Sequence, residues 1–319
     1  MFKRMNKNFS FAANEEIKFI YPDHSRILFY KSEYLNLRKE LIIDNFYILN
    51  EAENRVDGHI QFEHADDNRI SISHGTFGSL IMIGNSGYSL IYEFFLFIID
   101  FYKQASVRSV IIRHYAGFYD PVNSPVIETS LMHLGFNITL CDINHHLKIK
   151  NSLFSDHINK MELRQLKKCI EAGLEVRQAK GNEAGKIYDI MTEFRTQKNI
   201  PITFSKDDFA NSLEKMPENY TLFYVHDKQG EVIAATLMVR INDRVLYYFF
   251  PSDNPRRSSY SPMIMLMDGI FSYAKEHHYQ YIDLGISSKN NTPQKGLIQF
   301  KENIGGLASV RLTFQLDIP

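Results

Sequence analysis

The sequence has little cysteine, and its few cysteines lack the spacing of a metal site or a disulfide framework. Its two cysteines, Cys141 and Cys169, are far apart and belong to no CxxC or Cys/His motif. Disulfide-rich secreted domains and zinc sites need such residues in closely spaced groups. We therefore expect both cysteines to be reduced packing residues in a cytoplasmic protein that binds no metal.

The chain also lacks a strong net charge and a long apolar run. The formal net charge of the 319 residues is −1, so a nucleic acid would need a local binding site. The basic N-terminus has no apolar stretch like that of a secretory signal. The most hydrophobic run, residues 88–102, contains Glu93 and Asp100 and is shorter than the roughly 20 residues of a membrane span. We expect a buried helix there and no membrane span.

Length and composition indicate a soluble globular protein with two domains. Hydrophobic residues make up 44% and charged residues 23% of a chain of 319 residues, which is longer than single cores usually grow. In the second half, periodicity predicts a helix and then an antiparallel meander of three strands joined by short polar connections. The expected elements are a helix at 184–198, strands at 221–226, 232–240 and 245–250, a helix at 261–277, a strand at 281–286, a further helix and a strand at 308–318.

The first half repeats this order of elements. Strands precede the apolar helix at residues 88–103, and a strand, a second helix and a long closing strand follow it. In both halves the last helix is followed by glycine. We interpret the pattern as an internal duplication in the α/β (α+β) class, each half being a mixed, largely antiparallel sheet flanked by helices. The expected elements are strands at 46–50, 58–63, 69–73, 79–83, 109–115 and 136–149, and the second helix at 125–134.

A basic segment separates the two halves. Lys160, Arg164, Lys167 and Lys168 gather on an expected helix at residues 155–172. Two interpretations stay open, an ordinary solvated face and a binding site for phosphates. The expected division of the chain is a first domain at 1–150, a basic helical connector at 151–180 and a second domain at 181–319.

The stretch GLIQFKENIGG, near the C-terminus, raises a question about Lys301. Its apolar residues recur at helical spacing, which predicts a short helix with one face in a core. The helix then ends at Gly305 and Gly306. One interpretation is that Lys301 is a last-turn cation that interacts favourably with the helix dipole, with Gly305 as the C-cap. The other is that Lys301 is a functional cation. The apolar residues of this stretch are Leu297, Ile298, Phe300 and Ile304.

Three segments, in this order and spacing, resemble the GNAT superfamily of acyltransferases. They are LRQLKKCIEAGLEV in the connector, SPMIMLMDGIFSYAKEHHYQYIDLGISS, and GLIQFKENIGG. The similar branch is the tandem-domain one, with the Fem-type peptidoglycan aminoacyltransferases and the acyltransferases of surface-glycan pathways. The resemblance implies two GNAT-like domains, a degenerate first copy on the acceptor side and an acyl donor held by the second copy. It also implies that FKENIGG lies near the reacting centre.

The resemblance also implies a donor-binding loop. GNAT enzymes bind the pyrophosphate of coenzyme A on a loop of the form R/Q-x-x-G-x-G/A that opens a helix, where backbone N–H groups hold the anion. The nearest match is residues 256–261, with serine at both glycine positions. Ser261 could instead be an ordinary N-cap before Pro262. The expected donor-binding residues are Arg256, Arg257, Ser258, Ser259, Tyr260 and Ser261.

Three residues are candidates for the chemistry. An amine that attacks a thioester must be neutral, and the developing oxyanion needs a donor. Lys301 could stabilise that oxyanion or hold a substrate phosphate, the role that the Fem-type resemblance suggests. Asp283 could take a proton or merely cap a backbone group. Tyr247 and Tyr248 alternate along one strand, so only one of them can face the cleft, and Tyr248 is our candidate. Glu193 is a distant candidate for recognition of the amine.

These expectations favour an N-acyltransferase that moves an acyl group from acetyl-CoA or another acyl-CoA to an amine. The acceptor would be a small molecule or a cell-envelope precursor, such as an amino sugar or a peptide. One alternative is a Fem-like transferase that uses aminoacyl-tRNA, which would give the basic connector helix a purpose. Another is a binding module whose donor site has decayed, as the serines of the loop allow. We also expect residues 251–261 and Asp283 to line one groove.

Overall fold

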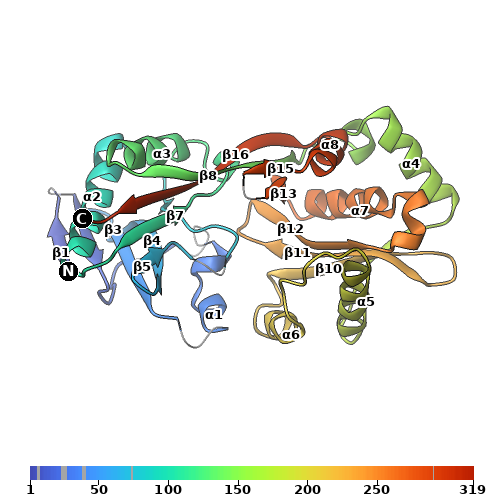
Figure 1. Cartoon of the computed structure of the whole chain (residues 1–319), viewed down its shortest axis with the longest axis horizontal. Helices are drawn as coiled ribbons and strands as arrows, with labels where there is room; N and C mark the ends of the chain where they lie inside the picture. The colour runs from blue at the N-terminus through green and yellow to red at the C-terminus, as the bar shows by residue number, and fades with distance from the viewer. Residues whose placement is uncertain (6–7, 23–26, 38–40, 73–74, 290) are drawn as a thin grey trace. The chain divides into compact units, whose positions relative to one another are not determined.

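The chain divides into two units, and Figure 1 labels most of their helices and strands. The computed structural model describes residues 1–5, 8–22, 27–37, 41–72, 75–289 and 291–319. Unit 1 contains residues 1–143, 288–292 and 309–319, and unit 2 contains residues 144–287 and 293–308. The division differs from the linear one that we expected, because the C-terminal strand belongs to unit 1 and the basic connector belongs to unit 2.

Unit 1 is an antiparallel meander that continues into a parallel strand pair. Its strands β1 to β5 pair antiparallel in chain order, and β6 pairs with β4. β5 then pairs parallel with β7, and β7 pairs antiparallel with β16. The elements are β1 (Phe2–Arg4), β2 (Phe9–Ala13), α1 (Ser32–Leu35), β3 (Ile43–Asn50), β4 (Arg55–Ala65), β5 (Asn68–Ile70), β6 (Ile81–Met82), α2 (Tyr88–Gln104), β7 (Ser109–Arg113), α3 (Ser124–His133) and β16 (Leu307–Asp317).

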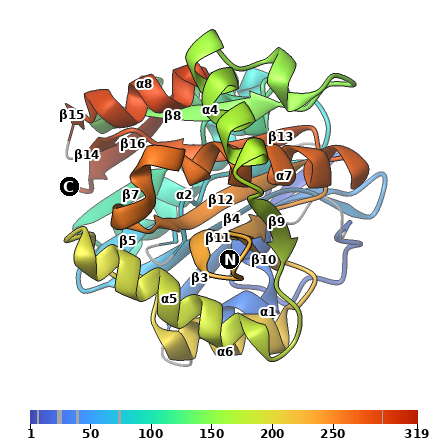
Figure 2. The ribbon, with the colours of Figure 1, turned by 90° about the vertical axis from the view of Figure 1, so that its right-hand side faces the viewer.

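Unit 2 has a sheet with helices on both faces. β9 to β12 pair antiparallel, β12 pairs parallel with β13, and β13 pairs antiparallel with the end of β8. α4 and α7 cover one face, and α5 and α6 lie on the other (Figures 1 and 2). The elements are the end of β8 (Asn137–Lys148), α4 (Lys160–Glu171), β9 (Glu175–Gln178), α5 (Glu183–Gln197), α6 (Lys206–Lys215), β10 (Tyr220–His226), β11 (Val232–Arg240), β12 (Val245–Asp253), α7 (Pro262–Glu276), β13 (Tyr281–Ile286) and α8 (Lys295–Asn303). The start of β8, the short strand β14 (Ser288–Lys289) and the first residue of β15 (Thr292–Pro293) belong to unit 1.

The two units share one topology, which confirms the predicted tandem mixed α/β architecture. In each unit an antiparallel meander leads through a long helix, α2 or α7, to a parallel strand pair. In each unit the second strand of that pair then takes an antiparallel neighbour. That neighbour comes from the other half of the sequence, β16 for unit 1 and the end of β8 for unit 2.

The core of unit 2 lies between its sheet and α7. Apolar residues of α7 at helical spacing, among them Ile264, Met267, Ile270 and Phe271, are buried against the strands. Burying each of these side chains stabilises the fold by roughly 1.5–3 kcal/mol. This burial holds the helix on the sheet. The apolar run at 88–102 likewise forms the predicted buried helix, α2. No helix in the described ranges is long and apolar enough to cross a membrane.

Candidate functional site

The candidate site lies where two parallel strands of unit 2 separate. β12 and β13 pair from Val245 and Tyr281 to Tyr247 and Asp283, and the pairing then stops although both strands continue. The register of β13 against β8 shifts between Asp283 and Gly285, and Gly285 has a φ of +73°. Glycine adopts this conformation at no steric cost, which permits the bulge. A pocket of about 300 Å³ opens where the strands diverge.

The pocket is mostly apolar and aromatic. The lining residues within the described part of the chain include two cations, Arg195 and Lys301, and no carboxylate. Small-molecule sites typically combine such an apolar wall with a few placed polar groups. The large apolar and aromatic side chains of the lining include Tyr247, Phe249, Phe250, Leu284, Leu297 and Phe300.

Lys301 is positioned by the way α8 ends. The N–H of Gly306 donates to the carbonyl oxygen of Lys301 at 2.8 Å, and the N–H of Gly305 donates to that of Glu302 at 2.9 Å. This pair of bonds is a Schellman ending, which favours glycine after the C-cap, here Ile304. Gly305 has a φ of +85°, and a Cβ at Gly306 would lie 2.5 Å from the Lys301 carbonyl oxygen. The double glycine therefore terminates α8 at Asn303, two residues after the lysine.

The Lys301 side chain lies inside unit 2 and not in solvent at the helix end. It is 4% exposed, and its Nζ donates to the carbonyl oxygens of Gly285 at 2.8 Å and Ile286 at 2.9 Å. The ammonium thus ties α8 to the bulge of β13 and forms part of the pocket wall. The apolar face that we expected in the core is there in part, since Ile304 is 0% exposed and Phe300 packs against the core cluster, whereas Leu297 is 42% exposed at the pocket.

Asp283 lies beside the pocket and is held by local groups. It is 2% exposed, and its Oδ1 accepts hydrogen bonds from Asn144 Nδ2 and from the N–H of Gly285, both at 2.8 Å. The second bond matches the backbone-capping role that we left open for this carboxylate. Asp283 therefore helps to fix the bulge that presents the carbonyl oxygens to Lys301.

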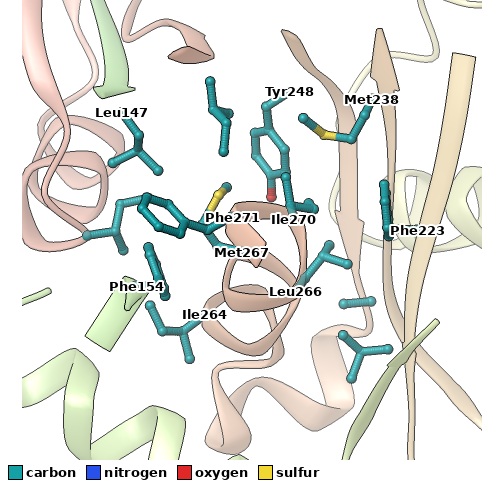
Figure 3. Close-up of a cluster of buried hydrophobic side chains, with 14 of the residues drawn as sticks. Leu147, Phe154, Phe223, Met238, Tyr248, Ile264, Leu266, Met267, Ile270 and Phe271 are labelled. Carbon is teal, nitrogen blue, oxygen red and sulfur yellow. The ribbon is translucent and has the colours of Figure 1, made fainter. Parts of the chain in front are cut away.

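Tyr248 is among the residues that line the pocket, but its side chain also belongs to the hydrophobic core, so its role as a cleft residue stays a prediction. It is 7% exposed, and its hydroxyl group points into the apolar cluster beside α7, near Met267 and Phe271 (Figure 3). Burial raises the pKa of this phenol far above its usual value, and the hydroxyl has no hydrogen-bond partner among the described residues. Tyr247 also lines the pocket, and a Cβ built on Gly285 would meet its hydroxyl oxygen at 3.4 Å.

Arg195 is a pocket residue that the sequence did not reveal. Its guanidinium lies 4.2 Å from the centre of the Phe250 ring, and it donates to the carbonyl oxygens of Pro201 and Pro251 at 2.8 and 3.1 Å. Partial burial lowers its pKa. Periodicity placed it on a helix, α5, but nothing in the local pattern distinguishes it from a surface arginine.

The expected donor loop forms a short 3-10 helix, Pro255–Tyr260, followed by α7. Ser261, at the second glycine position of the pattern, has a left-handed conformation with a φ of +48° and makes no side-chain capping bond. It is therefore not the ordinary N-cap that we considered. The carbonyl oxygen of Tyr260 accepts a hydrogen bond from Cys169 Sγ at 2.8 Å, and Ser259 is exposed. The side chain of Ser258 lies outside the described part of the structure.

The two arginines of the loop diverge, so the prediction of one groove is wrong. Arg257 binds the carboxylates of Glu231 at 2.7 Å and Asp227 at 3.6 Å and lines a pocket of about 220 Å³. Arg256 lines a separate pocket of about 320 Å³ together with Glu193, the distant candidate for amine recognition. Pro251 alone of this stretch lines the pocket beside Lys301.

The remaining expectations concern cysteines, cations and metals. Cys169 is buried as expected, whereas Cys141 is exposed and is not a packing residue. All four cations of the basic connector are exposed on α4. The described residues contain no cluster of three or more histidine, cysteine or acidic side chains able to hold a metal ion.

One segment of the chain matches a known protein family. Residues 160–301, from the start of α4 to Lys301, match the model of the acetyltransferase (GNAT) domain. The chain carries a GNAT acetyltransferase domain. This finding confirms the predicted GNAT-type acyltransferase. No curated protein matches the sequence.

Solved structures show the same tandem fold over most of the chain. FemX has a TM-score of 0.70 at 11% identity, covering 91% of this chain and 92% of its own. The C-terminal domain of a putative lysylphosphatidylglycerol synthetase from Agrobacterium fabrum has a TM-score of 0.56 at 10% identity, covering 85% and 84%. A tandem GNAT protein from the clavulanic acid biosynthesis pathway has a TM-score of 0.54 at 9% identity, covering 88% and 84%. At these identities the comparisons support the fold and not the substrate.

Proposed function

We propose that this acyltransferase moves an acyl group from acyl-CoA to the amine of a small molecule or a cell-envelope precursor. The observation that carries the proposal is the buried ammonium of Lys301 in the wall of the pocket between the diverging ends of β12 and β13. Backbone groups at such a divergence are available to an extended ligand, as at the edge of a sheet. The pocket can therefore receive an acyl donor next to a fixed positive charge.

The charge of the pocket suits attack by an amine. The amine must lose a proton before it attacks, and two cations without a lining carboxylate disfavour its ammonium form. Attack forms a C–N bond and places negative charge on the carbonyl oxygen. A fixed cation in a site of low dielectric stabilises that charge. The C–S bond then breaks, the thiolate leaves, and the proton of the amine passes to solvent.

The loop before α7 is the proposed binding site for the phosphates of the donor. The left-handed conformation of Ser261 occurs at a position where the donor-loop pattern has glycine, which indicates that the loop keeps its shape despite the serine. Arg256 makes no ion pair among the described residues and can contact phosphate. Arg257 is already neutralised by Glu231 and Asp227, so we assign it a smaller role.

Aminoacyl-tRNA is the second candidate for the donor. Four exposed cations on α4 favour it, and the fold is shared with FemX. The two donors predict opposite effects of salt and of mutation, because tRNA binding releases counterions from many phosphates and weakens steeply with salt.

The test is a comparison of donors on the same protein. Thermal unfolding is measured with acetyl-CoA, longer acyl-CoAs and aminoacyl-tRNA, because a ligand that binds the native state raises the unfolding temperature. The affinity of each ligand that binds is then measured at low and high salt. We expect acyl-CoA to stabilise the protein, and Arg256→Ala to weaken its binding by about 1.5–3 kcal/mol, the strength of a hydrogen bond to a charged group.

Arg257→Ala serves as the matched control and should weaken acyl-CoA binding less than Arg256→Ala. Neutralising Lys160, Arg164, Lys167 and Lys168 together should leave acyl-CoA affinity unchanged. A salt-steep loss of donor affinity confined to that α4 variant would replace acyl-CoA by aminoacyl-tRNA. Binding of acyl-CoA without transfer to any amine would identify a decayed binding module.

A further inference from the structure

We infer that the outer face of α4 docks the protein on an anionic phospholipid bilayer. The inner face of this helix, Lys160–Glu171, packs on the core of unit 2 through Leu166 and Cys169, which are 4% and 0% exposed. The outer face is left to solvent. The inference goes beyond acyl transfer and does not depend on which donor the enzyme uses.

The outer face of α4 is strongly basic. Lys160, Arg164, Lys167 and Lys168 are all exposed, and with 3.6 residues per turn they fall within an arc of about 100°. Glu171 is the single carboxylate on the same arc. None of the four cations makes an ion pair or a side-chain hydrogen bond within the described ranges. The formal net charge of the whole chain is only −1, so this face is a local concentration of positive charge.

Exposed apolar side chains border the cations. Met161 and Ile170, on the two sides of the basic arc, are 54% and 57% exposed, and Leu153, seven residues before the start of α4, is 67% exposed. An interfacial helix combines these two features, because its cations contact anionic headgroups and its apolar residues enter the acyl boundary. A surface that binds tRNA uses cations on phosphates and aromatic rings on bases, and these aliphatic side chains would have no partner there. The pattern therefore favours a bilayer over an RNA.

The experiment is sedimentation of the full chain with vesicles. One set contains equal parts of phosphatidylglycerol and phosphatidylcholine, and the other contains phosphatidylcholine alone. We expect binding to the anionic vesicles, weakened by salt, and little binding to the neutral ones. Each basic residue near an anionic surface contributes about fivefold to affinity. Changing Lys160, Arg164, Lys167 and Lys168 to glutamine should therefore lower affinity by a hundredfold or more.

A second variant separates the apolar contribution from the charge. Leu153→Ser, Met161→Ser and Ile170→Ser together should lower vesicle affinity about tenfold or more with every cation kept. The matched control changes two exposed lysines elsewhere in unit 2, Lys180→Gln and Lys215→Gln, and should bind like the original protein. Thermal unfolding of each variant verifies that α4 still packs on the core.

Three results would overturn the inference. The first is equal binding to anionic and neutral vesicles, or binding to neither. The second is undiminished binding by the apolar triple variant. The third concerns tRNA: the charge variant loses tRNA binding, the apolar variant keeps tRNA binding, and vesicles do not compete with tRNA. That result would make α4 an RNA-binding face.

Discussion

Replacing Lys301 with methionine separates its structural role from its chemical one. Methionine keeps most of the length of the side chain and removes the charge. The change deletes two hydrogen bonds from the ammonium, to Gly285 and Ile286, each worth roughly 1.5–3 kcal/mol for a charged group. It also removes a buried ion whose desolvation costs several kcal/mol. These contributions oppose one another, so we expect the free energy of unfolding to change by no more than about 2 kcal/mol.

The effect on catalysis should be larger than the effect on stability. If the ammonium stabilises the oxyanion, its loss should slow turnover by roughly ten- to a thousandfold, as for other lost electrostatic stabilisers. That range equals about 1.4–4 kcal/mol of transition-state stabilisation. The assay is the single-turnover rate of acyl transfer, measured well below the unfolding temperature, with denaturant unfolding of the same sample.

The matched control is Lys295→Met, because Lys295 begins the same helix and is exposed. It should change neither turnover nor stability by a measurable amount. Full activity in the Lys301→Met variant would refute the reasoning and leave this lysine as a tie between α8 and β13. A variant that loses activity only in proportion to its unfolded fraction would lead to the same conclusion.

Other predictions follow from individual residues. Gly306→Ala should lower the free energy of unfolding by about 1–3 kcal/mol, because the new Cβ would lie 2.5 Å from a backbone oxygen. Gly296→Ala is the control: its Cβ would meet nothing within 4 Å, so the change should be neutral or slightly stabilising. Denaturant unfolding of the two variants measures the difference. Ser261→Val should cost about 1–2 kcal/mol of stability, since a β-branched residue tolerates positive φ poorly, while Ser261→Gly should retain donor affinity in a binding titration. Burial lowers the pKa of His114 from 6.5 to about 3. Between these two pH values this histidine is protonated in the unfolded chain and neutral in the folded chain. Stability should therefore decline as pH falls from 6.5 towards 3, by about 2–3 kcal/mol between pH 6.5 and 4.5, and urea unfolding should show a flatter decline for His114→Gln.

Much of the fold could be predicted because local periodicity determined it. The apolar run that forms α2 and the meander of unit 2 combine strong periodicity with short polar connections. The exchange of closing strands could not be predicted in this way. Alternation shows that β16 is a strand, but its pairing with β7 depends on packing between distant parts of the chain. Short elements such as β9 and α6 were missed for want of a long periodic pattern.

The site was predicted in part, and the failures have physical causes. The segment FKENIGG and the double glycine identified Lys301, because a Schellman ending has a sequence signature. Periodicity placed Ile304 and Phe300 correctly against the core. It did not predict that Lys301 would be buried and Leu297 exposed, since it cannot foresee that a bulge in β13 offers two carbonyl oxygens to a lysine. Alternation showed that Tyr247 and Tyr248 face opposite sides of the sheet without showing which side holds the pocket. Arg195 depends on contacts with Phe250 and two prolines that only the folded chain brings together.

The most direct test of the proposed function is backbone hydrogen exchange of the full chain with and without acyl-CoA. Our account predicts protection from exchange in the diverging ends of the two strands, residues 247–251 and 284–286, and in the loop and first turn at residues 255–264. Unit 1 should change less, because the proposed donor site is made of residues of unit 2 alone. Protection confined to α4, or the absence of protection with every acyl-CoA, would contradict the account.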